Sequence, residues 1–118
     1  MNMKEFSLTT GLTSHTVRYY EKIGLLKNIE RTKSGHRIFS HADVIWVEFI
    51  TRLKDTGMPL KQIQQYAELR EQGDHTATDR MLLLEDHAAT LEARLALETQ
   101  HLKKLHDKIA YYKTLISS

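Results

Sequence analysis

The order of hydrophobic and polar positions predicts five helices and one short hairpin. Residues 4–10 fit a short helix in which Phe6 is the main buried side chain and the glycine that follows ends the helix. Thr13 or Ser14 then supplies an N-cap oxygen for a second helix that runs to about Lys22. Two short helices joined by a tight turn with a glycine are typical of a helix-turn-helix.

A hairpin is predicted directly after these helices. Ile29–Thr32 and His36–Phe39 flank a turn that contains Lys, Ser and Gly, and glycine readily adopts the positive φ of such turns. We expect Ile38 to point inward, together with one of Ile29 or Phe39. The residues expected to project around the tip are Arg31, Lys33, His36 and Arg37. The hairpin would then form a basic wing beside the second helix.

Two further helices are predicted to complete the core. Ser40 fits an N-cap with Asp43 three residues later, and Pro59 lies at a helix start, where its missing N–H costs little. The apolar stripes consist of Ala42, Ile45, Trp46, Phe49, Ile50 and Leu53, then Leu60, Ile63 and Ala67. Two roles stay open for Trp46, Phe49 and Tyr66: core packing, which the spacing favours, or the lining of an effector pocket.

The last part of the chain predicts one long helix that pairs with a second copy. From Thr78 onward there is neither Gly nor Pro, and a heptad seam carries Glu98 as its one charged member. Its apolar members are Leu84, Ala88, Leu91, Leu95, Leu102, Leu105, Ile109, Tyr112 and Ile116. A lone helix with a narrow apolar stripe is unstable, so we expect a coiled-coil homodimer. The expected parts are a DNA-binding domain (1–72), a connector (73–77) and a dimerisation helix (78–118).

Charge distribution points to a polyanionic partner for the first part alone. Residues 1–40 carry seven Lys and Arg against three Glu, whereas residues 41–118 carry ten against twelve acidic residues. We expect no signal peptide and no membrane span, because no apolar run approaches the roughly 20 residues that a bilayer requires. The expected location is the cytoplasm.

One face of the second helix has the chemistry of a DNA contact. His15, Arg18, Tyr19 and Lys22 follow the helical spacing of i, i+3, i+4 and i+7, and no carboxylate lies among them. Such side chains can donate to phosphates and to guanine edges, whereas merely solvated faces usually mix charge signs. The candidate DNA-binding residues are Ser14, His15, Thr16, Arg18, Tyr19, Lys22, Lys33, His36, Arg37 and Lys54.

The sequence offers no pattern for catalysis or for a cofactor. There is no cysteine, which removes disulfides, thiolate metal sites and sulfur nucleophiles. His101 and His106 are five residues apart and do not share a helix face, so we expect no metal site within one chain. A site assembled from histidines and carboxylates across the dimer stays open as an alternative.

Several of these segments resemble the signature of the MerR family of bacterial transcription regulators. The matching segments are Thr16-Val17-Arg18-Tyr19-Tyr20-Glu21, Gly24-Leu25-Leu26, Arg31, Gly35-His36-Arg37, Phe39 and Gly57-Met58-Pro59-Leu60. The resemblance implies a mainly α, winged helix-turn-helix head followed by a dimerisation helix that pairs antiparallel. It also implies recognition-helix contacts by Arg18 and Tyr19, a wing contact by Arg37 and a backbone contact by Lys54.

What the family does sets the functional expectation. The resemblance implies a dimer on a pseudo-palindromic promoter, whose overlong spacer is distorted in response to an effector so that bacterial RNA polymerase can engage it. Because this chain lacks cysteine, and Thr51 and Arg52 lie where stress-responsive relatives often carry one, we expect a non-thiolate, small-molecule effector. We also expect no appended ligand domain after Ser118. The alternative is an effector-independent, excisionase-like DNA-bending protein.

Overall fold

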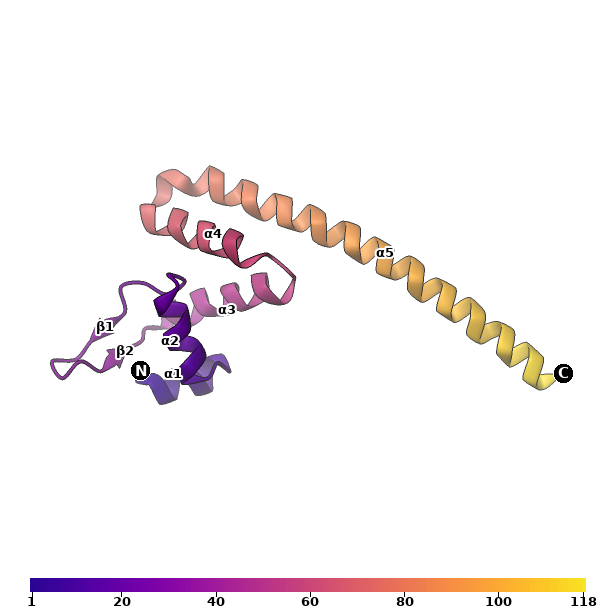
Figure 1. The fold of residues 1–118 in the computed structure, drawn as a ribbon, viewed down its shortest axis with the longest axis horizontal. Coiled ribbons are helices and arrows are strands. Elements are labelled where there is room, and N and C mark those ends of the chain that lie inside the picture. The colour runs from indigo at the N-terminus through magenta and orange to yellow at the C-terminus, as the bar shows by residue number, and fades with distance from the viewer. The chain divides into compact units, whose positions relative to one another are not determined.

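The computed structural model describes residues 1–118, which divide into two units, Met1–Leu83 and Leu84–Ser118. In order, the elements are α1 (Met3–Thr10), α2 (Ser14–Lys22), β1 (Glu30–Arg31), β2 (Arg37–Ile38), α3 (His41–Asp55), α4 (Leu60–Gln72), the 3-10 helix η1 (Asp74–Thr76) and α5 (Ala77–Ser117), as Figure 1 shows. The mainly α fold with a two-stranded wing and a long last helix is confirmed.

Side-chain caps fix where the first helices begin. Asn2 and Glu5 form a reciprocal capping box on α1, and Gly11 ends that helix at φ 75°. Thr13, rather than Ser14, is the N-cap of α2, and its hydroxyl accepts the N–H of Thr16. The tight turn between α1 and α2 therefore has both of its boundaries set by local chemistry.

An aromatic stack joins the wing to α1. The rings of Phe6 and Phe39 lie 4.0 Å apart with an interplanar angle of 7°, and both are buried. The prediction that Ile38 points inward is wrong, since Ile38 is 38% exposed. Successive strand residues point to opposite sides, so Ile38 and Phe39 cannot both face the core. Phe39 takes the inner position, where its ring stacks on Phe6. The strands are also shorter than predicted, with Arg31 opposite Arg37.

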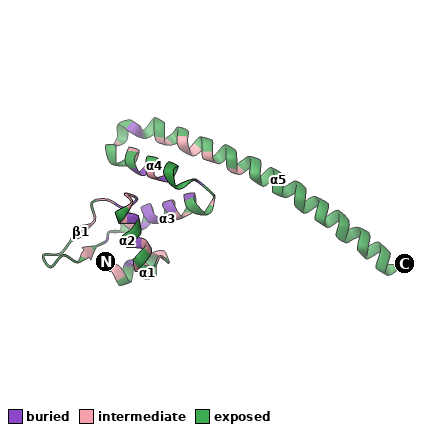
Figure 2. Cartoon of the chain, in the orientation of Figure 1, coloured by how far each residue is buried: buried purple, intermediate pink, exposed green.

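The core of the first unit lies where α3 meets the other helices. Ser40 and Asp43 form the predicted capping box on α3, and Val44, Val47 and Ile50 are buried. The apolar stripes of α3 and α4 are narrower than predicted. On α3, Ile45 is 56% exposed and Ala42 is exposed as well, and on α4 Leu60 is 45% exposed. Figure 2 shows the buried side of α3 and the exposed surface of α5. A helix of this size buries only the arc that faces its neighbours.

Two hydrogen bonds attach the turn after α2 to this core. The indole N–H of Trp46 donates to the Leu25 carbonyl at 2.7 Å, and the Gln64 amide donates to the Ile23 carbonyl at 3.1 Å. On the surface, Lys27 contacts Glu68 at 2.7 Å, and this hydrogen bond lowers the pKa of the Glu68 carboxyl. The end of α2 is thus held by both α3 and α4.

The connector has more structure than the polar sequence predicted. It forms η1, in which the buried Thr76 hydroxyl lies 2.6 Å from the Leu69 carbonyl and accepts the Arg80 Nε–H at 3.0 Å. After it, α5 continues for 41 residues and none of them is buried. The first compact unit extends into α5 as far as Leu83. The division into a DNA-binding domain (1–72), a connector (73–77) and a dimerisation helix (78–118) stays a prediction.

We predict that Phe6→Ala strongly destabilises the first unit. Removing a fully buried ring from a packed aromatic pair costs about 3–5 kcal/mol, which is a large part of the stability of a small domain. Urea unfolding measures the change. Leu8→Ala is the control on the same helix, since Leu8 is 77% exposed, and its effect should stay within about 0.5 kcal/mol. Equal losses in the two variants would contradict the assignment of the core.

Candidate DNA-binding interface

The second helix separates cleanly into a buried and an exposed side. Val17 and Tyr20 are buried against the core. The predicted contact residues His15, Arg18, Tyr19 and Lys22 are all exposed, and no protein partner binds the side chains of Arg18 and Lys22. Two formally charged groups are therefore left to solvent on one helix face, where they can donate hydrogen bonds to a polyanion.

The two residues predicted at the start of α2 are less accessible. Ser14 and Thr16 are each half-buried, and the Thr16 hydroxyl accepts a hydrogen bond from Thr13 at 3.0 Å. Thr16 also gives its backbone N–H to the Thr13 cap. These contacts stabilise the first turn of the helix, and they leave Thr16 with reduced capacity to bind another group.

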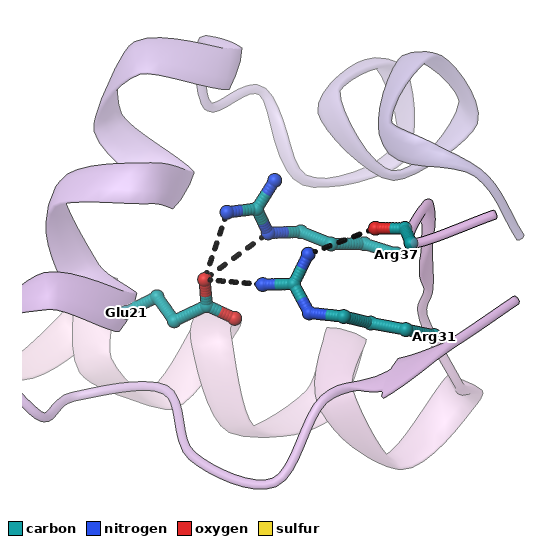
Figure 3. Close-up of polar contacts among 4 residues, drawn as sticks. Glu21, Arg31 and Arg37 are labelled. Atoms are coloured by element: carbon teal, nitrogen blue, oxygen red, sulfur yellow. Dashed lines mark hydrogen bonds and ion pairs between the residues drawn. The ribbon is translucent and has the colours of Figure 1, made fainter. Parts of the chain in front are cut away.

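A carboxylate on α2 holds the wing in place. Glu21 Oε1 accepts from Arg37 Nε at 3.1 Å and Nη2 at 2.8 Å, and from Arg31 Nη2 at 3.2 Å (Figure 3). Arg31 also donates to the Gly35 carbonyl at 3.1 Å. Arg31 and Arg37 were expected to project around the tip, but both are bound to Glu21 of α2, and only 22% of the Arg37 side chain is exposed. Glu21, the one acidic residue of α2, attracts both guanidinium groups, and this pairing was not predicted from the sequence.

The wing tip carries the remaining candidates. Lys33 and His36 are exposed, and the turn between them is closed by a Gly35 N–H to Thr32 carbonyl bond at 2.9 Å with Gly35 at φ 87°. The Thr32 hydroxyl accepts the His36 N–H at 3.1 Å. A short turn with these internal bonds presents its basic side chains at a defined position.

A concave basic site lies between α1, α2 and the wing. The cavity is about 300 Å³ and is lined by Asn2, Met3, Lys4, Arg18, Gly35, His36 and Arg37. Sequence reasoning missed Lys4. Its position in the first turn of α1 was a usable signal, because a cation there opposes the positive end of the helix dipole and gains nothing within the helix. The cavity has the charge and size to seat a phosphate group.

The second helix pair also meets the recognition helix. Lys54 Nζ lies 6.0 Å from the centre of the Tyr20 ring. A cavity of about 240 Å³ beside it is lined by Tyr19, Tyr20, Leu25, Ile50, Lys54, Met58, Leu60 and Ile63. The structure thus brings the exposed candidates Tyr19 and Lys54 to the rim of one cavity, although they are 35 positions apart in the chain.

Other predicted sites are also located by the structure. Trp46, Phe49 and Tyr66 form one aromatic cluster, with ring centres between 5.6 and 6.5 Å apart. The predicted seam residues all lie in the second unit, and each of them is at least partly exposed. No group of three or more His, Asp or Glu side chains comes together to hold a metal ion. None of the helices combines the length and the hydropathy needed to cross a bilayer.

A basic, exposed second helix of a helix-turn-helix, with a wing fixed beside it, defines a DNA-binding winged helix-turn-helix protein. Comparison with known families specifies which kind. Residues 1–69 match the MerR HTH family regulatory proteins, and residues 44–105 match the MerR DNA-binding family. The chain belongs to the MerR family, and it is a DNA-binding transcription regulator rather than an enzyme. The sequence resemblance is confirmed.

Individual relatives agree with this assignment. An HTH-type transcriptional regulator of Haemophilus influenzae is 36% identical over 103 residues, which are 87% of this chain and 76% of that protein. The regulator AdhR of Bacillus subtilis is 34% identical over 77% of this chain. The chain spans 65% of the length of AdhR and of heavy metal-dependent transcription regulator 2 of Rhizobium meliloti.

Solved structures share the fold over nearly the whole chain. A MerR family regulator from Listeria monocytogenes superposes with a TM-score of 0.91 at 34% identity, covering 97% of this chain and 86% of that one. HiNmlR, a MerR family regulator lacking the sensor domain and solved bound to promoter DNA, gives a TM-score of 0.85 at 33% identity. The match covers 96% of this chain and 90% of HiNmlR.

We predict that Glu21→Gln loosens the wing. The amide is a weaker acceptor than the carboxylate for two guanidinium groups. Because 43% of the Arg31 side chain and 25% of the Glu21 side chain are exposed, each ion pair contributes about 1 kcal/mol at most. Amide hydrogen exchange over residues 31–38 should become about fivefold faster or more. Glu30→Gln is the matched control, because Glu30 is exposed on the same hairpin. Unchanged exchange in Glu21→Gln would show that the ion pairs do not hold the wing.

Proposed function

We propose that the chain is a dimeric regulator of the MerR type that binds a pseudo-palindromic promoter and distorts its spacer in response to a non-thiolate effector. One observation carries the proposal: the cations of the exposed α2 face have no protein partner, while the wing arginines nearby do. An unpaired basic face beside a fixed wing suits a DNA groove with phosphates on both sides.

The proposed contacts come from the α2 face, from the wing side and from the second helix pair. On the α2 face, Arg18 lies at the centre and is suited to a base edge or to a phosphate, whereas Tyr19 and Lys22 are suited to the adjoining DNA backbone. Lys4, Lys33, His36 and Arg37 surround the wing side and would contact phosphates there. Arg37 needs no freedom from Glu21 to do so, because its Nη1 group is not used in that ion pair. Lys54 would contact the backbone near the second helix pair.

The proposed dimer follows from the long helix. None of the 41 residues of α5 is buried, although its seam repeats apolar side chains from Leu84 to Ile116. At 1.5 Å per residue this seam runs for roughly 50 Å, which a single exposed helix cannot stabilise in water. Pairing with a second copy in an antiparallel coiled coil would bury the seam and would fix two DNA-binding heads at a set separation.

The comparisons support the promoter as the target. HiNmlR lacks the sensor domain, was solved on promoter DNA and aligns with 96% of this chain. Spacer distortion would require the protein contacts to offset a DNA deformation energy on the order of a few kcal/mol. RNA polymerase would then engage the distorted promoter in the bacterial cytoplasm. Transcription assays with and without small molecules test the effector; a response that is independent of every ligand would favour the DNA-bending alternative.

We predict that Arg18→Ala weakens promoter binding about tenfold or more, because a lost base-edge or phosphate contact of this kind is worth roughly 1–3 kcal/mol. Fluorescence anisotropy on the promoter of its own or a neighbouring gene measures the affinity.

Lys4→Ala should weaken binding by the same factor on every DNA sequence, and it should reduce the slope of log affinity against log salt concentration by about one. Lys103→Ala in the second unit is the control. Wild-type affinity in both head variants would refute the assigned contacts.

We predict that Leu95→Lys shifts the protein from dimer to monomer. Burying a lysine in a coiled-coil seam removes apolar contact and leaves one uncompensated charge per chain in the interface. Leu97→Lys is a close control, since Leu95 and Leu97 are 53% and 52% exposed in the single chain and differ only in heptad position. Sedimentation velocity gives the mass of each. A dimer that survives Leu95→Lys, or that is lost equally in both, would contradict the proposed seam.

A further inference from the structure

One flank of the apolar seam on α5 carries its charges in a definite order. A polar side chain follows every second seam residue directly, so that the polar positions repeat every seven residues along the helix. The two positions nearest the start of the helix are acidic, and the two nearest its end are basic. We call this row the acid–base flank, and its members are Glu85, Glu92, Thr99, His106 and Lys113.

The charges of this flank have no partner in their own chain. Glu85 and Glu92 are exposed, and neither belongs to an ion pair of the folded chain. The residues three and four positions away from them, from which a basic side chain could reach, are only Met, Leu and Ala. Lys113 likewise has no carboxylate at this spacing. The flank charges are therefore left for a partner outside the helix.

We propose that the acid–base flank selects a second copy of this chain and fixes the register of the antiparallel pair. A two-fold axis perpendicular to two antiparallel helices brings each flank onto the same flank of the other copy in reverse order. With the axis near Gln100, Glu85 would lie opposite Lys113 of the partner subunit. Glu92 would lie opposite His106 of the partner subunit, whose imidazole N–H can donate to the carboxylate. The inference rests on the proposed function, since it names the partner and the register of that dimer.

The apolar seam favours the same register. With the axis near Gln100, all ten seam positions, Glu98 included, find an opposite seam position, and Leu84 would face Ile116 of the partner subunit. A slip of one heptad in either direction leaves two of the ten positions in each chain without an opposite member. Either slip also keeps only two of the four acid–base contacts in the dimer. Packing and charge therefore agree on one register.

Glu98, the charged residue of the seam, favours the antiparallel orientation. In a parallel pair each seam residue faces its own copy, so two Glu98 carboxylates would share one layer of the interface, where like charges are costly. A parallel pair would also bring Lys108 beside Lys113 of the partner subunit. In the antiparallel register Glu98 would instead face Leu102 of the partner subunit. The two carboxylates then lie in separate layers.

The opposite flank of the seam cannot make the same selection. It contains no carboxylate, and its members are His87, Arg94, His101, Lys108 and Leu115. In the antiparallel pair this flank would meet itself, and its basic groups would face one another across solvent, where screening keeps the repulsion small. The acid–base flank is therefore the side of α5 that distinguishes one partner and one register from others.

Charge reversal on the full-length chain tests the proposal. Glu85→Lys with Glu92→Lys makes the flank basic throughout, and His106→Glu with Lys113→Glu makes it acidic throughout. Each double variant alone should dimerise about tenfold or more weakly than the wild type, because every flank contact becomes repulsive. An equimolar mixture should regain the wild-type affinity as a heterodimer. Sedimentation velocity measures the affinity, and native mass spectrometry distinguishes heterodimers from homodimers by mass.

A matched control separates the flank from net charge. Asp86→Lys with Asp107→Lys makes the same change in net charge one residue further round the helix, at positions that point away from the seam. This control should dimerise as the wild type does. Equal weakening in the control would mean that net charge explains the effect, and the proposal fails. It also fails if the mixture dimerises no better than the acidic variant alone, which a parallel pair would produce.

Cysteine cross-linking tests the orientation and the position of the axis, because the chain has no cysteine of its own. Thr99→Cys would place two thiols close to the axis, and a short bismaleimide should join them into a covalent dimer. Ala88→Cys is the control in the seam. Its two copies would lie roughly 36 Å apart along the antiparallel helices, so they should not be joined. The reverse pattern would indicate a parallel pair and would overturn the proposal.

Promoter binding is measured on the same samples, which separates this inference from the proposed function. The heterodimer of the two charge-reversed variants should bind the promoter as the wild type does, because both of its heads are unchanged. A wild-type dimer that binds the promoter, but whose dimerisation ignores the flank charges, would contradict this inference and leave the proposed regulator intact. A wild-type chain that stays monomeric would contradict the proposed dimer itself.

Discussion

The contact between one carboxylate and two arginines decides how the DNA-binding surface is built. Glu21 projects from the recognition helix toward the wing and takes up the charge of Arg31 and Arg37. This leaves the remaining cations of the surface unpaired. It also joins two elements that sequence-local bonds could not hold together, because a two-stranded hairpin is marginal by itself. The surface is thus divided into arginines that position the wing and cations that remain available to a partner.

A second set of contacts fixes the other end of the recognition helix. Hydrogen bonds from Trp46 and Gln64 reach the carbonyls of Leu25 and Ile23, so the turn after α2 is determined by residues of α3 and α4. The helix is held at its C-terminal end by long-range polar contacts and at its N-terminal end by the Thr13 cap. This arrangement allows the exposed face to vary in sequence while the position of the helix is maintained.

Local chemistry was predictable from the sequence, whereas contacts between distant elements were not. The caps at Ser40 and Gly11, the wing and the long helix all follow from short-range rules. Ile45 and Leu60 were misplaced because hydrophobic spacing shows which residues share a face and not how wide the buried arc is. Lys4 and the pairing of Glu21 with the wing were missed because α1 and α2 meet the hairpin only in the folded chain. Nothing in the sequence distinguishes Thr76 from the other polar residues of the connector, so its burial was not predictable.

The bonds at the first residue have a practical consequence for work with this protein. The Met1 ammonium donates to the Phe39 carbonyl at 2.7 Å, and the Met1 carbonyl accepts the Phe39 N–H at 2.7 Å, so the first residue extends the edge of the wing. A fusion tag attached before Met1 would convert that ammonium into a neutral amide and place added chain beside the basic cavity of Lys4 and His36. Affinity purification and surface immobilisation for DNA measurements should therefore use the other end of the chain.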